Sequence, residues 1–340
     1  MRFRLCALAT FVAAAIVLAS PAHAQSPEKA RISIGVGGKS LLYYLPLTIA
    51  DRQGYFNAEG LDVEILDFPG GAKALQALLG GSVDVVSGAY EHTISQQAKG
   101  QNIEALVLQG KYSAIVLGMS KAKAAQYKSP KDLKGMKIGV TAPGSSTNMF
   151  VNILLAKDGL KPDDVSIIGV GATAGAVAIM KHGEIDAISN LDPVIAQLES
   201  DGTIVPVVDT RTAKGMQEVY GGAYAAGVIY APVEFAKKYP NTAQAIVNAM
   251  VRAARFIQHS TADQIVAAVP ADYYTDRALY KTALEKNLET FQHDGSISLE
   301  GQQNVARDLL SFDPTMQGAK IDLSKTVNMT FQQKAAQKYK

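Results

Sequence analysis

Two stretches of the chain, Asp62-Val-Glu-Ile-Leu66 and Asp164-Val-Ser-Ile-Ile168, carry the same apolar pattern. A shift of 102 residues superposes them, and Ile34-Gly35-Val36 resembles Ile138-Gly139-Val140 at a shift of 104. Such an ungapped match predicts an internal duplication, and therefore two lobes of one plan. The match continues downstream at these pairs: Ala72 and Ala174, Ala74 and Ala176, Gly81 and Gly183, Asp84 and Asp186, Ser87 and Ser189.

Both copies alternate short β-branched runs with helical patterns, which is typical of parallel βαβ units covered on both faces. We therefore predict an α/β fold in which each lobe is a mostly parallel sheet flanked by helices. In the first copy we expect strands at 32–36, 63–67 and 83–87, helices at 45–56 and 72–79, and a last helix from Tyr90. In the second copy we expect strands at 137–140, 165–169 and 185–189, helices at 148–157 and 175–181, and a last helix from Pro193.

The pattern changes from Gly221 onward, where 223–231 is typical of an apolar strand that returns from the second lobe. After it, the stretches 241–258, 278–291, 299–310 and the tail after Ser324 indicate helices, which we expect to close the back of the first lobe. Lobe 1 is thus predicted to comprise 25–112 and 226–340, and lobe 2 to comprise 113–225. The lobes should be joined near 108–117 and 221–229, with a ligand cleft between them.

The first 24 residues have the features of a secretory signal peptide. Arg2 and Arg4 precede an apolar run over 5–18, and Ala22-His23-Ala24 offers small residues where a signal peptidase cleaves. We predict cleavage before Gln25 and a periplasmic product. The apolar run is short for a membrane span, and nothing later approaches 18 apolar residues. Processing would also remove Cys6, which is the one cysteine of the chain.

Composition and motifs exclude several functions. Lys+Arg is 33 and Asp+Glu is 31, which argues against nucleic-acid binding. The patterns G-x-S-x-G and H-E-x-x-H are absent, and the spacing of the remaining histidines predicts no metal site. Gly169-Val-Gly-Ala-Thr-Ala174 fits a loose dinucleotide pattern, but no acidic residue ends the next strand. We therefore predict no catalytic residue, no metal and no cofactor.

Loops rich in small residues follow the strands of both copies, and each of them leads into a helix. Helix N-termini present free N–H groups that attract anions, and ligands bind at the carboxyl ends of strands. Aromatic residues in these loops can cover a ligand and also form hydrogen bonds to it. The predicted ligand-binding residues are Ser40, Tyr43, Tyr44, Gly70, Gly71, Ser87, Gly88, Tyr90, His92, Gly144, Ser145, Ser146, Thr147, Thr173, Asn190, Asp192 and Tyr224.

Several stretches together resemble the nitrate/sulfonate/taurine-type solute-binding proteins of ATP-driven importers. The resemblance is specific in its order and spacing and spans most of the chain. It implies the two-lobed type II periplasmic-binding-protein fold, which fungal thiamine-pyrimidine synthases share. The stretches are Tyr44-Leu-Pro-Leu-Thr-Ile-Ala-Asp-Arg-Gln-Gly-Tyr-Phe56, Glu59-Gly-Leu-Asp-Val63, Ser129-Pro-Lys-Asp-Leu-Lys-Gly-Met-Lys-Ile-Gly-Val140, Gly144-Ser145, Gly159-Leu160, Gly183-Glu-Ile-Asp-Ala187 and Asp192-Pro193.

The resemblance implies a monomeric receptor that performs no chemistry and delivers its solute to a membrane permease with its ATPase. The amide-rich loops favour a small organic anion, either a sulfonate or a carboxylate. A pyrimidine-type vitamin precursor is the alternative, because Glu91 and Asp192 would repel an anion and accept hydrogen bonds from amino groups. Two alternatives of other classes are a secreted enzyme on this fold and a sensor subunit that reports to a membrane receptor.

Overall fold

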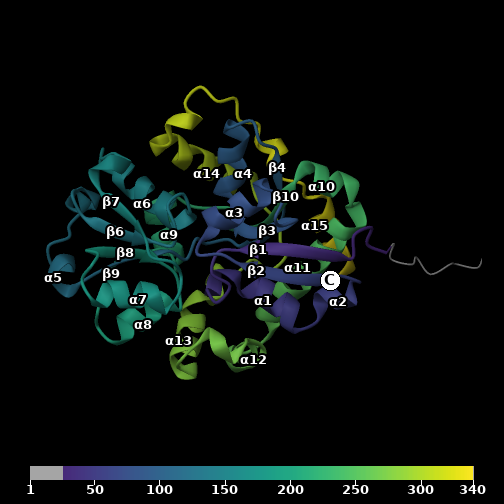
Figure 1. The fold of residues 1–340 in the computed structure, drawn as a ribbon, viewed down its shortest axis with the longest axis horizontal. Helices are drawn as coiled ribbons and strands as arrows, with labels where there is room; N and C mark the ends of the chain where they lie inside the picture. The colour runs from purple at the N-terminus through teal and green to yellow at the C-terminus, as the bar shows by residue number, and fades with distance from the viewer. Residues whose placement is uncertain (1–25, 340) are drawn as a thin grey trace, which may run out of the picture.

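Two five-stranded sheets lie side by side in the computed structural model, each with helices around it (Figure 1). The structure describes residues 26–339, so the predicted signal peptide lies outside the described residues. Within this part of the chain, no helix combines the length and the apolar character that a bilayer span requires.

The first sheet has the strand order β2-β1-β3-β10-β4. Its parallel part consists of β2 (Asp62–Asp67), β1 (Arg31–Val36) and β3 (Val85–Ala89). Strand β10 (Gly227–Pro232) lies antiparallel between β3 and β4 (Ile103–Gly110). All eight residues of β4 are buried, because three helices pack against this strand: α4 (Glu91–Ala98), α11 (Pro240–His259) and α15 (Thr330–Lys338).

The second sheet repeats this order as β7-β6-β8-β5-β9. Strands β7 (Ser166–Gly169), β6 (Lys137–Val140) and β8 (Ala187–Asn190) are parallel. Strand β5 (Val116–Met119) lies antiparallel between β8 and β9 (Val205–Asp209). The two sheets therefore match strand for strand, and the predicted two-lobed, mostly parallel α/β fold is confirmed.

Helices connect the parallel strands. The predicted helix at 45–56 is divided in two, because Gly54 takes a left-handed conformation (φ +68°) between α1 and α2. The bounds of these helices are α1 Leu45–Arg52, α2 Tyr55–Ala58, α3 Gly71–Leu79, α4 Glu91–Ala98, α5 Lys121–Ala124, α6 Ser146–Lys157, α7 Ala174–Lys181, α8 Val194–Ser200 and α9 Ala213–Tyr220.

We expected all of the C-terminal helices to cover the first lobe, but only some of them do. Helices α11 and α15 pack against β4 of that sheet. Helix α13 instead packs against α8 of the second lobe, and α14 packs against α6 and α9 of the second lobe as well as against α4 of the first. The C-terminal segment thus contacts both lobes, and the predicted lobe boundaries stay predictions. The bounds are α10 Val233–Lys238, α11 Pro240–His259, α12 Ala262–Ala268, α13 Arg277–Asn287, α14 Leu299–Phe312 and α15 Thr330–Lys338.

Two crossovers join the sheets. One runs over 111–115, from β4 of the first sheet to β5 of the second. The other runs over 221–226, from α9 back to β10. Both contain left-handed backbone: Ala114 has φ +55°, Gly221 has φ +77° and Gly222 has φ +137°. A side chain at the last of these angles would be strained, so the second crossover requires glycine there.

Candidate functional site

The loops at the carboxyl ends of the two sheets contact one another directly. Each contact pairs a loop that follows a strand of the first sheet with a loop that follows a strand of the second. The lobes are therefore closed on each other in this structure. The hydrogen bonds run from Ala72 N–H to Ser145 Oγ (2.9 Å), from Leu42 N–H to the Asp192 carbonyl oxygen (2.9 Å) and from His92 Nε2 to the Gly144 carbonyl oxygen (3.4 Å).

Two glycines allow this close approach. A Cβ atom on Gly70 would lie 2.8 Å from the Ala142 Cβ atom, and one on Gly38 would lie 2.5 Å from the Ala172 Cβ atom. Both distances are shorter than van der Waals contact between carbon atoms. Gly70 was predicted as a ligand contact, and in this structure its hydrogen atoms face the opposite lobe instead.

A buried carboxylate lies where the lobes and the second crossover meet. Glu91 is the first residue of α4 and is 3% exposed. Its Oε1 atom accepts a hydrogen bond from the Tyr224 hydroxyl (3.3 Å), whereas its Oε2 atom is buried and has no partner among residues 26–339. Two tyrosine pairs lie near enough for its charge to raise their pKa values, Tyr43 with Tyr44 (centroids 5.1 Å apart) and Tyr220 with Tyr224 (4.0 Å). We call these five residues, together with Gln109, the Glu91 cluster.

The electrostatics of the cluster follow from its burial. Loss of solvent raises the pKa of Glu91 to about 7, with Asp308 also raising it and the Tyr224 hydrogen bond opposing the shift. Burial, together with the charge of Glu91, raises the pKa values of Tyr43, Tyr220 and Tyr224 well above 10. These phenols therefore stay neutral, and each can act as a hydrogen-bond donor.

Gln109 adds a donor to the cluster from the end of β4. Its Oε1 atom accepts a hydrogen bond from the Ser87 hydroxyl (3.0 Å), and its Nε2 atom is buried without a partner in the described chain. A Cβ atom built on Gly227 would lie 3.2 Å both from this Nε2 atom and from Cζ of Tyr43. The free amide donor therefore lies beside the Tyr43 ring.

His92 connects the two lobes. Burial lowers its pKa to about 4, so the ring is neutral at pH 7. One hydrogen-bond pattern fits both contacts: the Tyr230 hydroxyl donates to Nδ1 (3.2 Å), and Nε2–H donates to the Gly144 carbonyl. The Tyr230 ring also covers Gly88, where a Cβ atom would lie 2.9 Å from Cε1 of Tyr230.

Asp192 was predicted to accept from a ligand, but its two carboxylate oxygens already have protein partners. Its Oδ1 atom accepts from the backbone N–H of Ala196 (2.8 Å), and its Oδ2 atom accepts from Asn287 Nδ2 (2.6 Å) and Arg211 Nη1 (3.2 Å). The Arg211 guanidinium is further paired with Asp209 and Glu199. In this structure Asp192 therefore ties α13 to the second lobe, and its predicted ligand contact stays a prediction.

Three other predicted ligand residues also form internal bonds. The Tyr90 hydroxyl contacts Thr326 and Gln302, which places it behind the first sheet, next to the C-terminal segment. Asn190 bonds the backbone of Gly171 and Leu191, and Thr147 Oγ1 accepts from the backbone N–H of Thr141. These side chains hold their loops in shape. Ser146 is half-buried at the start of α6, and Gly71 begins α3.

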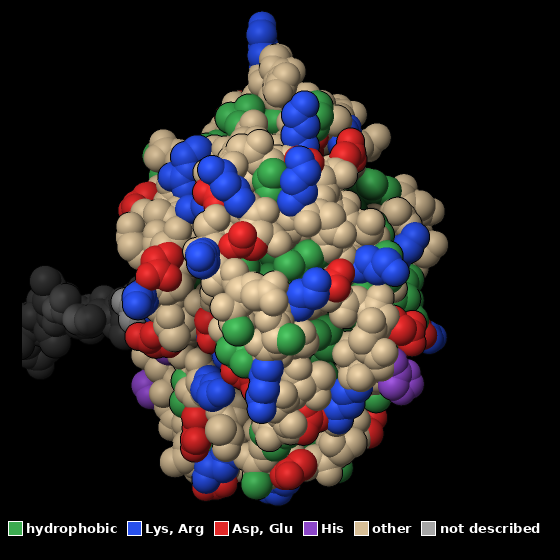
Figure 2. Space-filling view, turned by 90° about the vertical axis from the view of Figure 1, so that its left-hand side faces the viewer, with side chains coloured by type: hydrophobic (Ala, Val, Ile, Leu, Met, Phe, Trp, Pro, Cys, Tyr) green, Lys and Arg blue, Asp and Glu red, His purple; other side chains and the backbone are tan. Residues whose placement is uncertain are grey.

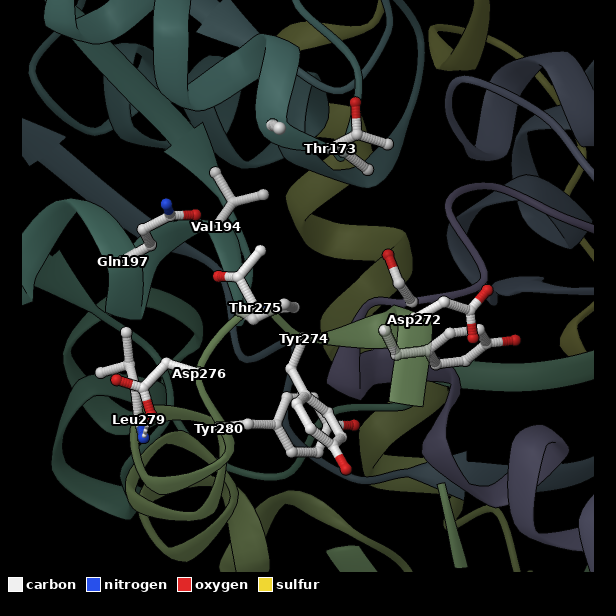
Figure 3. Close-up of a pocket in the computed structure, with 14 residues that line it drawn as sticks. Thr173, Val194, Gln197, Asp272, Tyr274, Thr275, Asp276, Leu279 and Tyr280 are labelled. Carbon is white, nitrogen blue, oxygen red and sulfur yellow. Dashed lines mark hydrogen bonds between the residues drawn. The ribbon is translucent and has the colours of Figure 1, made fainter. Parts of the chain in front are cut away.

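Ser40 and Thr173 line a separate cavity of about 290 Å³ (Figure 3). Thr173, Val194 and Gln197 of the second lobe lie across it from the segment Asp272 to Asp276. The rings of Tyr274 and Tyr280, which also line it, have centroids 5.0 Å apart. The cavity shares no lining residue with the Glu91 cluster, and Asp276 uses its carboxylate to cap α13.

The Glu91 cluster is our candidate site because it lies at the carboxyl ends of the first sheet's strands and has a free acceptor and a free donor. The sequence missed Gln109, Tyr220 and Tyr230 as site residues. The two tyrosines at 220 and 224, which flank the Gly221-Gly222 crossover, were the available signal. Among residues 26–339, no group of three His, Cys, Asp or Glu side chains could hold a metal ion.

Charged side chains of both signs are interspersed on the face formed by the second lobe (Figure 2). This face has the mixed surface charge that the near balance of 33 basic and 31 acidic residues suggests.

Comparisons with known proteins connect this architecture to a family. A solved structure from Bordetella bronchiseptica RB50 is 54% identical, with a TM-score of 0.90, and the match covers 93% of this chain and 99% of that one. The alkanesulfonate-binding protein of Xanthomonas axonopodis, solved with bound MOPS, is 17% identical with a TM-score of 0.70, and the match covers 89% of this chain and 99% of that one. The second likeness shows the fold alone.

A curated relative from Schizosaccharomyces pombe, 4-amino-5-hydroxymethyl-2-methylpyrimidine phosphate synthase, is 31% identical over 147 residues. That match covers 42% of this chain and 40% of the relative, so the chain spans less than half of the relative's length. The family resemblance expected from the sequence is confirmed: residues 25–271 match the NMT1-like family model, and the chain belongs to the NMT1-like family.

Proposed function

We propose that this chain is the solute-binding receptor of an ATP-driven importer, which closes on a small organic solute and delivers it to a membrane permease. The observation that carries the proposal is the arrangement of two matching lobes around a buried polar cluster. Two crossovers with left-handed backbone join the lobes, and such connections can act as hinges. The export signal expected at residues 1–24 would place the receptor in the periplasm, and we propose that it acts there as a monomer.

The comparisons support this role without identifying the solute. The Xanthomonas structure is described as an alkanesulfonate-binding protein, and its two-lobed fold matches most of this chain. The synthase from Schizosaccharomyces pombe supports an enzymatic alternative, but the match reaches 40% of its length. In the candidate site His92 is held by Tyr230 and Gly144, and Ser87 is bonded to Gln109 rather than to a base. We therefore propose binding without chemistry.

Two solute classes follow from the site. A sulfonate or carboxylate, favoured from the sequence, would bind where the lobes now meet, because opening them frees the Ala72 N–H and the Ser145 hydroxyl. Against it, Arg211 is the one buried Lys or Arg side chain among residues 26–339, and three carboxylates already surround it. An amino-bearing solute, such as a pyrimidine precursor, fits the free oxygen of Glu91 better, and we propose this class as the preferred one.

A thermal-shift screen of sulfonates, carboxylates and amino-heterocycles tests the receptor role. A solute present at 100 times its dissociation constant should stabilise the fold by about 2.7 kcal/mol. For each binder, small-angle scattering should show a smaller radius of gyration in the complex, and mass spectrometry should recover the solute unchanged. Scattering curves that are identical with and without every binder would refute closure, and conversion of a solute would favour the enzyme.

A further inference from the structure

Two buried polar atoms of the Glu91 cluster have no partner in the described chain, and they are of opposite kinds. Oε2 of Glu91 is a carboxylate acceptor, and Nε2 of Gln109 is an amide donor. Buried polar groups are nearly always hydrogen-bonded, because leaving one unpaired destabilises the fold. The other polar atom of each side chain is hydrogen-bonded, Oε1 of Glu91 to Tyr224 and Oε1 of Gln109 to Ser87.

The groups that act on Glu91 come from several elements, and the cation beside them, Arg307, is already paired with Asp308. Tyr43 and Tyr44 come from the 3₁₀-helix η1 (Leu42–Tyr44), Tyr220 from the end of α9 and Tyr224 from the crossover. Asp308 of α14 adds a second carboxylate behind Glu91. The neighbouring His92 is neutral. Among residues 26–339, no Lys or Arg side chain forms an ion pair with Glu91.

We infer that Glu91 selects the solute by charge, with Oε2 accepting a hydrogen bond from a cationic nitrogen that the tyrosine rings enclose. This inference rests on the proposed receptor function. A cation against tyrosine faces gains cation–π attraction, which is stronger where water is excluded. The free Nε2–H of Gln109 donates to an acceptor elsewhere on the same solute. The chemical class is an amine, an amidine or a protonated amino-heterocycle, and a simple carboxylate or sulfonate is disfavoured.

Binding of such a cation is coupled to release of a proton. At pH 7 about half of the molecules hold a proton on Glu91, since its pKa is raised to about 7 by burial. The ion pair requires the ionised carboxylate, so this proton leaves to solvent when the solute binds. The affinity should therefore rise with pH and be about tenfold higher at pH 8 than at pH 6. An anionic solute that accepts a hydrogen bond from the protonated Glu91 carboxyl group would instead bind more weakly as the pH rises.

The test uses benzamidine and benzoate, which have similar sizes and opposite charges, and 4-aminopyrimidine, which has ring acceptors. Calorimetric titration of the full chain at pH 6 and pH 8 should detect benzamidine at both pH values but not benzoate, and 4-aminopyrimidine, which is largely neutral at pH 8, should bind more weakly than benzamidine there. The benzamidine affinity should rise about tenfold between these pH values, and two buffers of different ionisation enthalpy should reveal the released proton. Glu91→Gln should weaken benzamidine about ten- to a hundredfold and abolish the pH dependence.

Two further variants complete the design. Glu64→Gln, at an exposed site on β2, is the matched control for loss of one carboxylate and should leave both the affinity and its pH slope unchanged. Gln109→Leu should weaken 4-aminopyrimidine more than benzamidine, because benzamidine lacks the ring acceptors. The inference is overturned if benzamidine does not bind, or if Glu91→Gln binds benzamidine as the wild type does. Closure on benzoate alone would overturn it while leaving the receptor function standing.

Discussion

Replacing the Glu91 carboxylate by an amide should raise the stability of the folded protein relative to the wild type as the pH rises. Burial raises the pKa of this group from 4.5 to about 7. The folded state therefore holds the proton more tightly than the unfolded state does, and between these pH values it binds more protons. Stability that depends on Glu91 is thus fully present below pH 4.5 and is lost as the pH rises through 7.

The two pKa values give the size of this effect. A difference of one pKa unit corresponds to about 1.4 kcal/mol, and integration from pH 5 to pH 8 gives a loss of about 2–3 kcal/mol attributable to Glu91. Glu91→Gln removes this loss because the amide does not titrate. Its buried amide hydrogens add a penalty of their own, but that penalty is the same at every pH. The stability gap, defined as the free energy of unfolding of Glu91→Gln minus that of the wild type, should therefore rise by about 2–3 kcal/mol over this range.

Urea denaturation without solute, at pH 5, 6, 7 and 8, measures this gap. The chain has no tryptophan and 14 tyrosines, so far-UV circular dichroism and tyrosine fluorescence are the suitable signals. Glu64→Gln, which removes an exposed carboxylate, should keep a nearly constant gap. A constant or shrinking gap for Glu91→Gln as the pH rises would refute the reasoning, because it would mean that Glu91 ionises in the fold without a penalty.

Three further substitutions probe the lobe contacts. Gly70→Ala keeps an extended backbone but puts a Cβ atom 2.8 Å from the Ala142 Cβ atom, so its complex with a solute should close less fully and show a larger radius of gyration than the wild-type complex by small-angle scattering. Asp192→Asn removes one charge around Arg211 and should lower the free energy of unfolding by about 2–4 kcal/mol in urea; unchanged stability would contradict its structural role. Gly222→Ala, at φ +137°, should cost about 1–3 kcal/mol in the same measurement, and a neutral result would argue against a fixed crossover.

The duplicated strands could be predicted because they are set by local pattern. The predicted strand at 137–140 coincides with β6, and the ends of the other predicted strands are close to the observed ones. Strand β4 was not predicted because its sequence, Ile103-Glu-Ala-Leu-Val-Leu-Gln-Gly110, is apolar without alternation. Such a run suits a helix or a fully buried strand equally well, and only its packing decides between them.

The partners of individual side chains could not be predicted in the same way. Asp192 was predicted to contact a ligand because it follows a strand, and it does follow β8. Its hydrogen-bond partners Arg211 and Asn287, however, lie 19 and 95 residues away in sequence. The Tyr90 hydroxyl has its partner Thr326 at a separation of 236 residues. A loop's position at the end of a sheet follows from topology, whereas the direction of each side chain depends on segments that pack there from elsewhere.

The run Tyr90-Glu91-His92 shows how this limit applies to function. Successive residues on a helix point about 100° apart, so the start of α4 sends three neighbours to three places. Tyr90 binds the C-terminal segment, His92 reaches the opposite lobe at Gly144, and Glu91 enters the tyrosine cluster. The first two have all their bonds within the protein and so stabilise it. Glu91 alone keeps a buried oxygen free, and a fold that tolerates this cost retains there an interaction that a bound solute can complete.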